Sequence, residues 1–190
     1  VGDGTEIIDL GGALTVPGLI ESHGHFTSLG NSKMILDLTA AGSWDEIVAL
    51  VAEAAQSAQP GEWIRGRGWH QDKWDRVPEP SVEGLPVHDA LSAATPDNPV
   101  LLTHASGHSA LANAKAMELS KITRATTDPD GGRIVRDARG DAIGAFIETA
   151  QSLVRYEAGH ASPEEAAART RRMIELASEE CLAHGVTTFH

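Results

Sequence analysis

The stretch "PGLIESHGHF", residues 17–26, places two histidines one residue apart at the end of a short apolar run. Successive side chains of a β-strand alternate between its faces, so His23 and His25 are predicted to project the same way, with Gly24 leaving room between them. Two imidazoles on one face can bind one ion, and Zn²⁺ accepts nitrogen ligands at roughly 2.0–2.2 Å. The alternative is two polar residues where a strand meets a loop, and spacing alone does not decide between them.

The residues before and after this stretch indicate short strands and helices. Turn signals at Asp3-Gly4 and Gly11-Gly12 predict a small β-hairpin over residues 1–16, which leads into a strand over 18–22. The sequence "SWDE" is a capping box that begins a helix at Ser43, and Pro60-Gly61 ends that helix.

Further along, helical and strand patterns continue to alternate, and the residues 77–99 are rich in proline and are predicted to be a mostly irregular insertion. The other predicted elements are strands at 63–66, 100–103 and 186–190, helices at about 109–119, 149–158 and 163–183, a helical turn at 88–93 and a hairpin around Arg139-Gly140. Such alternation favours an α/β fold with parallel strand pairing.

Composition limits the classes of partner. The chain has 190 residues, of which 41% are hydrophobic, so it can form a sizeable core. Its formal net charge of −12 disfavours nucleic acid and anionic membrane surfaces as partners. The single cysteine, Cys181, excludes a disulfide framework within the chain. No apolar run reaches the roughly 18 residues needed to span a bilayer.

The ends of the sequence favour an excerpt from a longer protein, because residue 1 is Val and the last residues form an isolated strand pattern. No export signal opens the chain, so a cytoplasmic location is expected. A periplasmic location is the alternative, because the native N-terminus is not included.

Several motifs together resemble one enzyme family. The run "DLGGALTVPGLIESHGHF" is similar to the first barrel strand of the amidohydrolase superfamily, with Glu21 where aspartate is more usual. The segments "GEWIRGRGWHQDKW", "THASGHSALANAKAMEL", "TTDPDGGRIVRDARGDAIGAFIETA" and "LAHGVTTFH" resemble the amidohydrolase-3 branch, which includes N-substituted formamide deformylases. The resemblance covers nearly the whole chain. His70 stands where that branch more often has aspartate, so it inherits no role.

The resemblance implies a (β/α)₈ barrel, flanked by a small β-sandwich, that binds one or two divalent ions, most simply zinc. Residues 1–16 would belong to the sandwich, and residues 17–190 would form the N-terminal part of the barrel. The implied activity is metal-assisted hydrolysis of a non-peptide C–N bond, of the amide or formamide type, in a small-molecule substrate. The alternatives are the same metal apparatus acting on another bond, and a non-catalytic chain whose histidines are structural.

Under this resemblance His23 and His25 are the metal ligands, and further residues become candidates. Glu148 ends the apolar strand "GAFIE", where it is predicted to act as a metal bridge or proton shuttle, or simply as a strand-end carboxylate or helix cap. His108 and His104 lie in a turn after a buried strand, where substrate-facing residues are common. The alternative for both is a loop histidine bonded to the backbone.

Aromatic and basic residues of one segment are candidates for substrate binding. The tryptophans at 63, 69 and 74 are predicted either to line a hydrophobic pocket, Trp69 above all, or to pack in the core. Arg67 or Arg65 would meet an anionic group. Because a barrel of this type takes about 250 residues, the 190-residue chain is expected to be inactive alone, to bind metal weakly and to self-associate, for example as a homo-oligomer.

Overall fold

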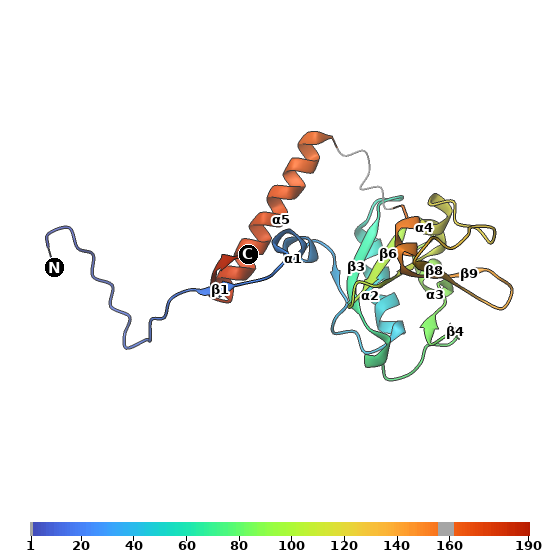
Figure 1. Cartoon of the computed structure of the whole chain (residues 1–190), viewed down its shortest axis with the longest axis horizontal. Coiled ribbons are helices and arrows are strands. Elements are labelled where there is room, and N and C mark those ends of the chain that lie inside the picture. Colours follow the sequence, from blue (N-terminus) through green and yellow to red (C-terminus); the bar gives the residue numbers. More distant parts are fainter. Residues whose placement is uncertain (1, 156–161) are drawn as a thin grey trace.

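The computed structural model describes residues 2–155 and 162–190, and its elements form two groups (Figure 1). The first group brings together the two ends of the chain. Strand β1 (Leu19–Glu21) pairs in parallel with β10 (Val186–Phe189), and helix α1 (Phe26–Ser32) packs against helix α5 (Pro163–Ala183). The predicted strands at both ends of the chain and the last helix are therefore confirmed.

The second group is a six-stranded sheet built from the residues between α1 and α5, in the order β2-β3-β6-β7-β9-β8. Its first three strands are parallel and the others are antiparallel, so the predicted parallel pairing holds for one half of the sheet. These strands are β2 (Leu36–Asp37), β3 (Ile64–Trp69), β6 (Val100–His104), β7 (Ser109–Ala112), β8 (Gly132–Arg136) and β9 (Ala142–Glu148).

Helices cover both faces of this sheet. Neighbouring residues on one strand point to opposite faces, so a single strand packs against helices on both sides. On β8, Val135 packs in the same buried cluster as residues of α2, whereas Ile134 packs with residues of α4 and η2. The remaining elements are α2 (Trp44–Ser57), η1 (Gln71–Lys73), β4 (Ser81–Val82), β5 (Leu85–Pro86), α3 (Asp89–Ala94), α4 (Ala114–Leu119) and η2 (Thr149–Leu153).

The capping signals in the sequence are confirmed at both long helices. The Ser43 side chain accepts the Glu46 N–H at 3.1 Å, although the Glu46 carboxylate reaches the Gly42 N–H and not that of Ser43. In α5 the capping box is complete, since Ser162 and Glu165 bond each other's backbone. Each satisfied N-cap contributes about 1 kcal/mol to helix stability.

The helix predicted for residues 109–119 is wrong in its first part. Residues Ser109–Ala112 form β7, between β6 and β9, and α4 begins only after Asn113. The run "SALA" has ordinary helix formers, but the hydrogen bonds available between two open strands override this weak local preference. Of the helical segment predicted over 149–158, residues 149–153 form the short helix η2, and 156–158 lie outside the described residues.

A further expectation, the hairpin over residues 1–16, is corrected. Turns form at residues 3–4 and 11–12, but no strands pair over residues 2–16; Leu14 is 88% exposed there, and an isolated hairpin without a surface to cover is marginal in water. The helical turn predicted within the stretch 77–99 is confirmed by α3, and the interpretation of this stretch as an insertion stays a prediction. The stretch contains β4, β5 and α3, and it buries Leu85 and Leu91 in the main core.

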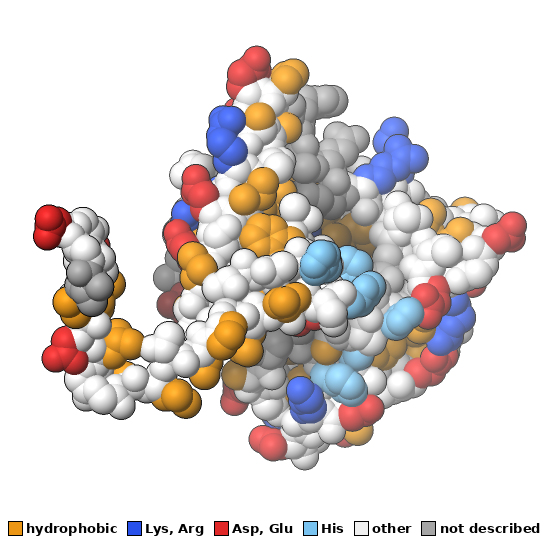
Figure 2. Space-filling model, turned by 60° about the vertical axis from the view of Figure 1, so that its left-hand side comes forward, with side chains coloured by type: hydrophobic (Ala, Val, Ile, Leu, Met, Phe, Trp, Pro, Cys, Tyr) orange, Lys and Arg blue, Asp and Glu red, His pale blue; other side chains and the backbone are white. Residues whose placement is uncertain are grey.

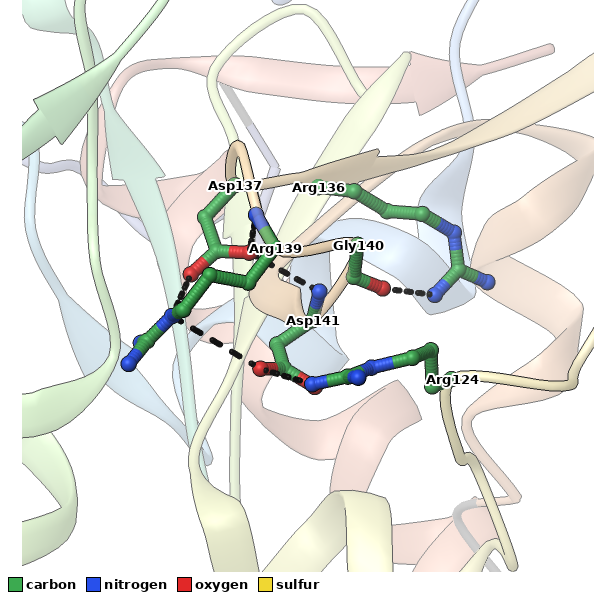
Figure 3. Close-up of polar contacts among 6 residues, drawn as sticks. All are labelled: Arg124, Arg136, Asp137, Arg139, Gly140 and Asp141. Carbon is green, nitrogen blue, oxygen red and sulfur yellow. Dashed lines mark hydrogen bonds and ion pairs between the residues drawn. The ribbon is translucent and has the colours of Figure 1, made fainter.

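The hairpin predicted around Arg139-Gly140 is confirmed, and polar contacts hold its turn (Figure 3). Asp137 accepts the backbone N–H groups of Arg139 and Asp141, both at 2.9 Å. The carboxylate of Asp141 in turn pairs with Arg124, at 2.7 Å. The ion pair joins side chains that are 63% and 46% exposed, so it adds little stability, and the backbone bonds accepted by Asp137 define the turn.

A closed barrel is not formed by the described residues, because β1 and β10 make a two-stranded sheet separate from the six-stranded one. The overall class is thus mixed α/β, as predicted, and the partial barrel stays a prediction. Within the described ranges, no helix is both long and apolar enough to cross a membrane.

Candidate functional site

The histidine pair lies directly after β1, where the chain turns into α1. The ring centroids of His23 and His25 are 5.8 Å apart, with the rings at 73°, and both residues are exposed. His25 is the N-cap residue of α1, so the strand ends before it, yet the two rings remain neighbours. Two imidazoles bound to one ion through bonds of about 2.0–2.1 Å have centres roughly 5–6 Å apart, so this spacing fits a shared ion.

The backbone of the pair is fixed by the last residue of the chain. The Gly24 N–H donates to the His190 carbonyl at 2.8 Å, and the His190 N–H donates to the Glu21 carbonyl at 3.0 Å. The Glu21 carboxylate accepts the His23 N–H at 3.0 Å. The histidines are therefore presented by paired strands and not by a free loop.

Gly24 is required by close packing. A Cβ at this position would lie 2.3 Å from Cζ of Phe189, whose ring packs edge-on against Phe26 at 5.1 Å between centroids. A side chain added at so tight a position displaces its neighbours and lowers the free energy of unfolding by about 1–3 kcal/mol.

We expect Gly24→Ala to push the Phe189 ring away and to tilt the two histidines apart. The melting temperature should fall by several degrees, and divalent-ion affinity should fall with it. The double variant Gly24→Ala/Phe189→Leu, which makes room for the methyl group, should recover most of both losses. A single variant with native stability and native ion binding would contradict this account of the glycine.

A second set of polar residues meets at one edge of the six-stranded sheet. Strands β3 and β6 are parallel and end at the same edge, where His104 is the last residue of β6 and His70 follows β3. Strand β7 runs the other way, so His108, which precedes it, lies at this edge, and Glu148 ends β9 beside it. Histidine side chains gather on one face of the molecule (Figure 2).

His108 and Glu148 are brought together, as their common assignment to catalysis requires. Nδ1 of His108 lies 3.1 Å from Oε2 of Glu148, and the Glu148 N–H donates to the His108 carbonyl at 2.8 Å. Both side chains are more than half exposed, so the pair itself adds little to folding stability. Its position is open to a small molecule.

The backbone of Glu148 is strained. Its φ of 52° and ψ of −128° lie in a region that glycine favours, which costs about 1–3 kcal/mol in other residues. Gln151 holds the strained turn, because its side-chain amide donates to the carbonyls of Gly107 and Glu148 at 3.1 and 3.2 Å. Strain of this kind is concentrated at functional sites, which favours the functional interpretation of Glu148 over a simple cap. Its side chain makes no cap hydrogen bond to η2.

His104 is buried, at 7% exposure, and its tautomer follows from its contacts. Nδ1 accepts the Ser106 N–H at 3.1 Å, so the proton of the neutral ring is on Nε2. Nε2 is buried and has no hydrogen-bond partner among the described residues. Burial lowers the pKa of His104, and the neighbouring His70, whose ring centroid is 4.7 Å away, lowers it further.

This lowered pKa predicts a stability that depends on pH. Below the ordinary value near 6.5, the unfolded chain binds a proton at His104 that the folded chain does not, so stability falls as the pH falls through that range towards the folded pKa. The non-titrating variant His104→Asn keeps an acceptor for the Ser106 N–H. Its stability, measured by urea unfolding at pH 7.5, 6.5 and 5.5, should fall less steeply than that of the native chain. Equal slopes would contradict the prediction.

The two remaining candidates differ in exposure. Trp69 is fully buried, and its Nε1 donates to the Leu102 carbonyl at 2.9 Å, so the structure gives it a packing role in place of the predicted substrate contact. Arg67 is exposed at the end of β3. The family resemblance implies no role for His70, but its ring lies beside that of His104. The sequence signal for this contact is that His70 directly follows β3, a strand parallel to β6, which ends at His104.

The described residues do not form a metal site with three or more protein ligands. No group of three or more His, Cys, Asp or Glu side chains there is arranged to hold an ion, so Glu148 does not join His23 and His25. The imidazole pair has the donor chemistry and spacing of two ligands, but a catalytic zinc site takes three from the protein. The pair therefore fits part of a metal site.

The structure is thus a mixed α/β chain with an exposed histidine pair directly after a strand of a parallel pair. The chain belongs to the amidohydrolase family, whose family model matches residues 6–189.

Named relatives agree with this membership. The chain is 36% identical over 188 residues to "Protein LONG AFTER FAR-RED 3" of Arabidopsis thaliana, covering 99% of this chain and 30% of that protein. It is 28% identical over 184 residues to the "N-substituted formamide deformylase" of Arthrobacter pascens, covering 96% of this chain and 33% of that enzyme. The chain thus spans about a third of the length of these relatives.

A solved structure shows the same fold. The match is an uncharacterized metal-dependent hydrolase from Pyrococcus horikoshii OT3, with a TM-score of 0.57 and 26% sequence identity. It covers 91% of this chain and 30% of the solved chain.

Proposed function

We propose that this chain contributes the first metal ligands, His23 and His25, to a hydrolase that cleaves a non-peptide C–N bond of a small molecule. The observation that carries the proposal is the position of the two imidazoles, 5.8 Å apart at the end of paired strands. Family membership supports a metal-dependent hydrolase, and the similarity to a protein named as an N-substituted formamide deformylase supports an amide or formamide bond.

The proposed ion is divalent, with zinc as the first choice because imidazole is among its preferred ligands. When bound, such an ion polarises a carbonyl group and makes water more acidic, which is the chemistry that amide hydrolysis needs. The exposed rings favour a site that keeps a position open over a closed structural site, since structural zinc has four protein ligands.

The proposed roles of the chain's own residues follow from their contacts. Glu148 is proposed as the group that moves a proton, because its carboxylate shares a hydrogen bond with Nδ1 of His108 at 3.1 Å. His108 would hold that carboxylate in place or accept the proton from it. His104 would stay neutral near pH 7 because burial lowers its pKa, and it is proposed to hold the turn after β6 through the Ser106 N–H that its Nδ1 accepts.

The experiment is a metal-dependence assay on the longer purified protein of which these 190 residues are expected to be a part. Release of formate and amine from an N-substituted formamide would be compared with hydrolysis of an ester and of a dipeptide. Turnover of the formamide should be lost after treatment with a chelator and restored by Zn²⁺, Mn²⁺ or Co²⁺. Faster turnover of the ester would change the bond assigned, and turnover that resists metal removal would overturn the proposed mechanism.

A further inference from the structure

A cleft of about 470 Å³ lies where the end of α1 meets the sheet. This volume falls within the usual range for small-molecule sites. The cleft adjoins the histidines at the sheet edge, because Ala105, which follows His104, forms part of its wall. Its polar walls come from both groups of elements, namely Ser32 and Lys33 of α1, Asp37 and Thr39 around β2, and Arg67 with Gly68 of β3.

The guanidinium of Arg67 has no hydrogen bond or ion pair among the residues that the structure describes. Asp37 is its cross-strand neighbour in the β2–β3 register, and it would be the natural partner. Asp37 is instead engaged with Thr39, accepting its N–H at 2.9 Å and its hydroxyl at 2.7 Å. These bonds from Thr39, followed by the charge of Lys33, lower the pKa of Asp37. Arg67 is therefore left as an uncompensated cation.

The other cation of the cleft is already neutralised. Nζ of Lys33 lies 2.8 Å from Oε1 of Glu180 on α5. Gly68 completes the wall, because its lack of a side chain lets Thr39 approach; a Cβ there would lie 2.5 Å from Cγ2 of Thr39. The chain has a formal charge of −12, so most of its surface repels anions. An arginine without a partner at a cleft is a place where an anion binds favourably and a cation does not.

We propose that this cleft binds the carboxylate group of a small molecule, with Arg67 as its charged partner. A guanidinium matches a carboxylate through two parallel hydrogen bonds, and such charge-assisted pairs are roughly twice as strong as neutral ones. Ile35, Leu36 and Ala105 supply apolar wall for the remainder of the molecule. That this molecule is the substrate of the hydrolase, an amide bearing a carboxylate, rests on the proposed function; the binding itself does not.

The test is a binding titration of the 190-residue chain followed by NMR, without added metal. N-formylglycine is the probe, N-formylglycinamide is its neutral counterpart, and inorganic phosphate is a second anion. N-formylglycine should shift the signals of residues around Arg67 and bind more tightly than the amide. Arg67→Gln should weaken its binding by about tenfold or more, and Arg67→Lys, which keeps the charge but not the planar fork, should fall between. Arg171→Gln, an exposed change on α5 with the same loss of charge, should have no effect.

The proposal is overturned if Arg67→Gln binds N-formylglycine as tightly as the native chain, if the neutral amide binds equally well, or if phosphate alone binds. Thermal unfolding of each variant shows whether its fold is intact, and Arg67→Lys supplies the comparison if Arg67→Gln does not fold. Because no turnover is measured, binding that depends on Arg67 supports the cleft even if formamide hydrolysis is never observed. Loss of binding with retained hydrolysis would reject the cleft and leave the proposed function standing.

Discussion

Replacing His23 or His25 with alanine is expected to remove divalent-ion binding at the end of β1 and, in the longer protein of which this chain is expected to be a part, the proposed hydrolytic activity. Each imidazole is one of the two proposed ligands, whose rings lie side by side in the described structure, and a single exposed imidazole holds an ion poorly. The loss in affinity for Zn²⁺ or Co²⁺ should exceed the roughly 10–100-fold that removal of an outer-shell partner alone costs. Titration of untagged protein with Co²⁺, followed by its absorption spectrum, measures this directly.

The matched control for these variants is His184→Ala. His184 is an exposed histidine that caps α5, at the opposite end of the β1–β10 pair from His23 and His25. The His184→Ala variant loses one imidazole but keeps both histidines of the pair, so its affinity for the ion should equal that of the native chain. Native affinity in both His23→Ala and His25→Ala would reject the assignment, and an equal loss in all three variants would indicate nonspecific binding.

The second large effect is expected at Asn113, which is fully buried and joins four parts of the second group. Its Oδ1 accepts the N–H groups of Val100 and Ala116, both at 2.9 Å. Its Nδ2 donates to the Asn98 carbonyl at 2.8 Å and to Oγ1 of Thr95 at 2.9 Å. Asn113→Ala would leave these buried groups without partners, and we expect a loss of about 3–5 kcal/mol in the free energy of unfolding.

Urea unfolding at neutral pH measures this loss, and Ser43→Ala is the matched control. Ser43 also caps a helix, but its bond to the Glu46 N–H is exposed, so its loss should cost only about 1 kcal/mol. If Asn113→Ala costs no more than Ser43→Ala, the buried network around Asn113 contributes less than its hydrogen bonds indicate.

Asn113 also shows where sequence reasoning ends. The sequence places it inside a helical pattern, whereas in the structure it directly follows β7 and caps α4. Its partners lie 3, 13, 15 and 18 positions away along the chain. Local periodicity carries no signal from such distances, so a hub of this kind is found only once the strands are paired.

The parts predicted correctly are those whose cause is local. The capped helices, the strand just before His23 and the hairpin at Arg139-Gly140 follow from neighbouring residues alone. The pairing of His108 with Glu148, 40 residues apart, depends on β7 lying beside β9, and the family resemblance pointed to both residues without their contact. Arg67 was predicted as an anion contact, but its lack of a partner depends on how Thr39 occupies Asp37.

The pairing of β1 with β10 has a consequence for the time course of folding. Leu19 and Val186 are partners across nearly the whole chain, and the six-stranded sheet forms from the residues between them. Closing a loop of that length is entropically costly, and the cost falls once the intervening residues are already compact. The strand pair should therefore close late, after the sheet. His23 and His25 would then gain their fixed geometry in the last kinetic phase. Binding of a divalent ion should therefore report the completion of folding, whereas tryptophan fluorescence, from a core that includes Trp69, should report an earlier event.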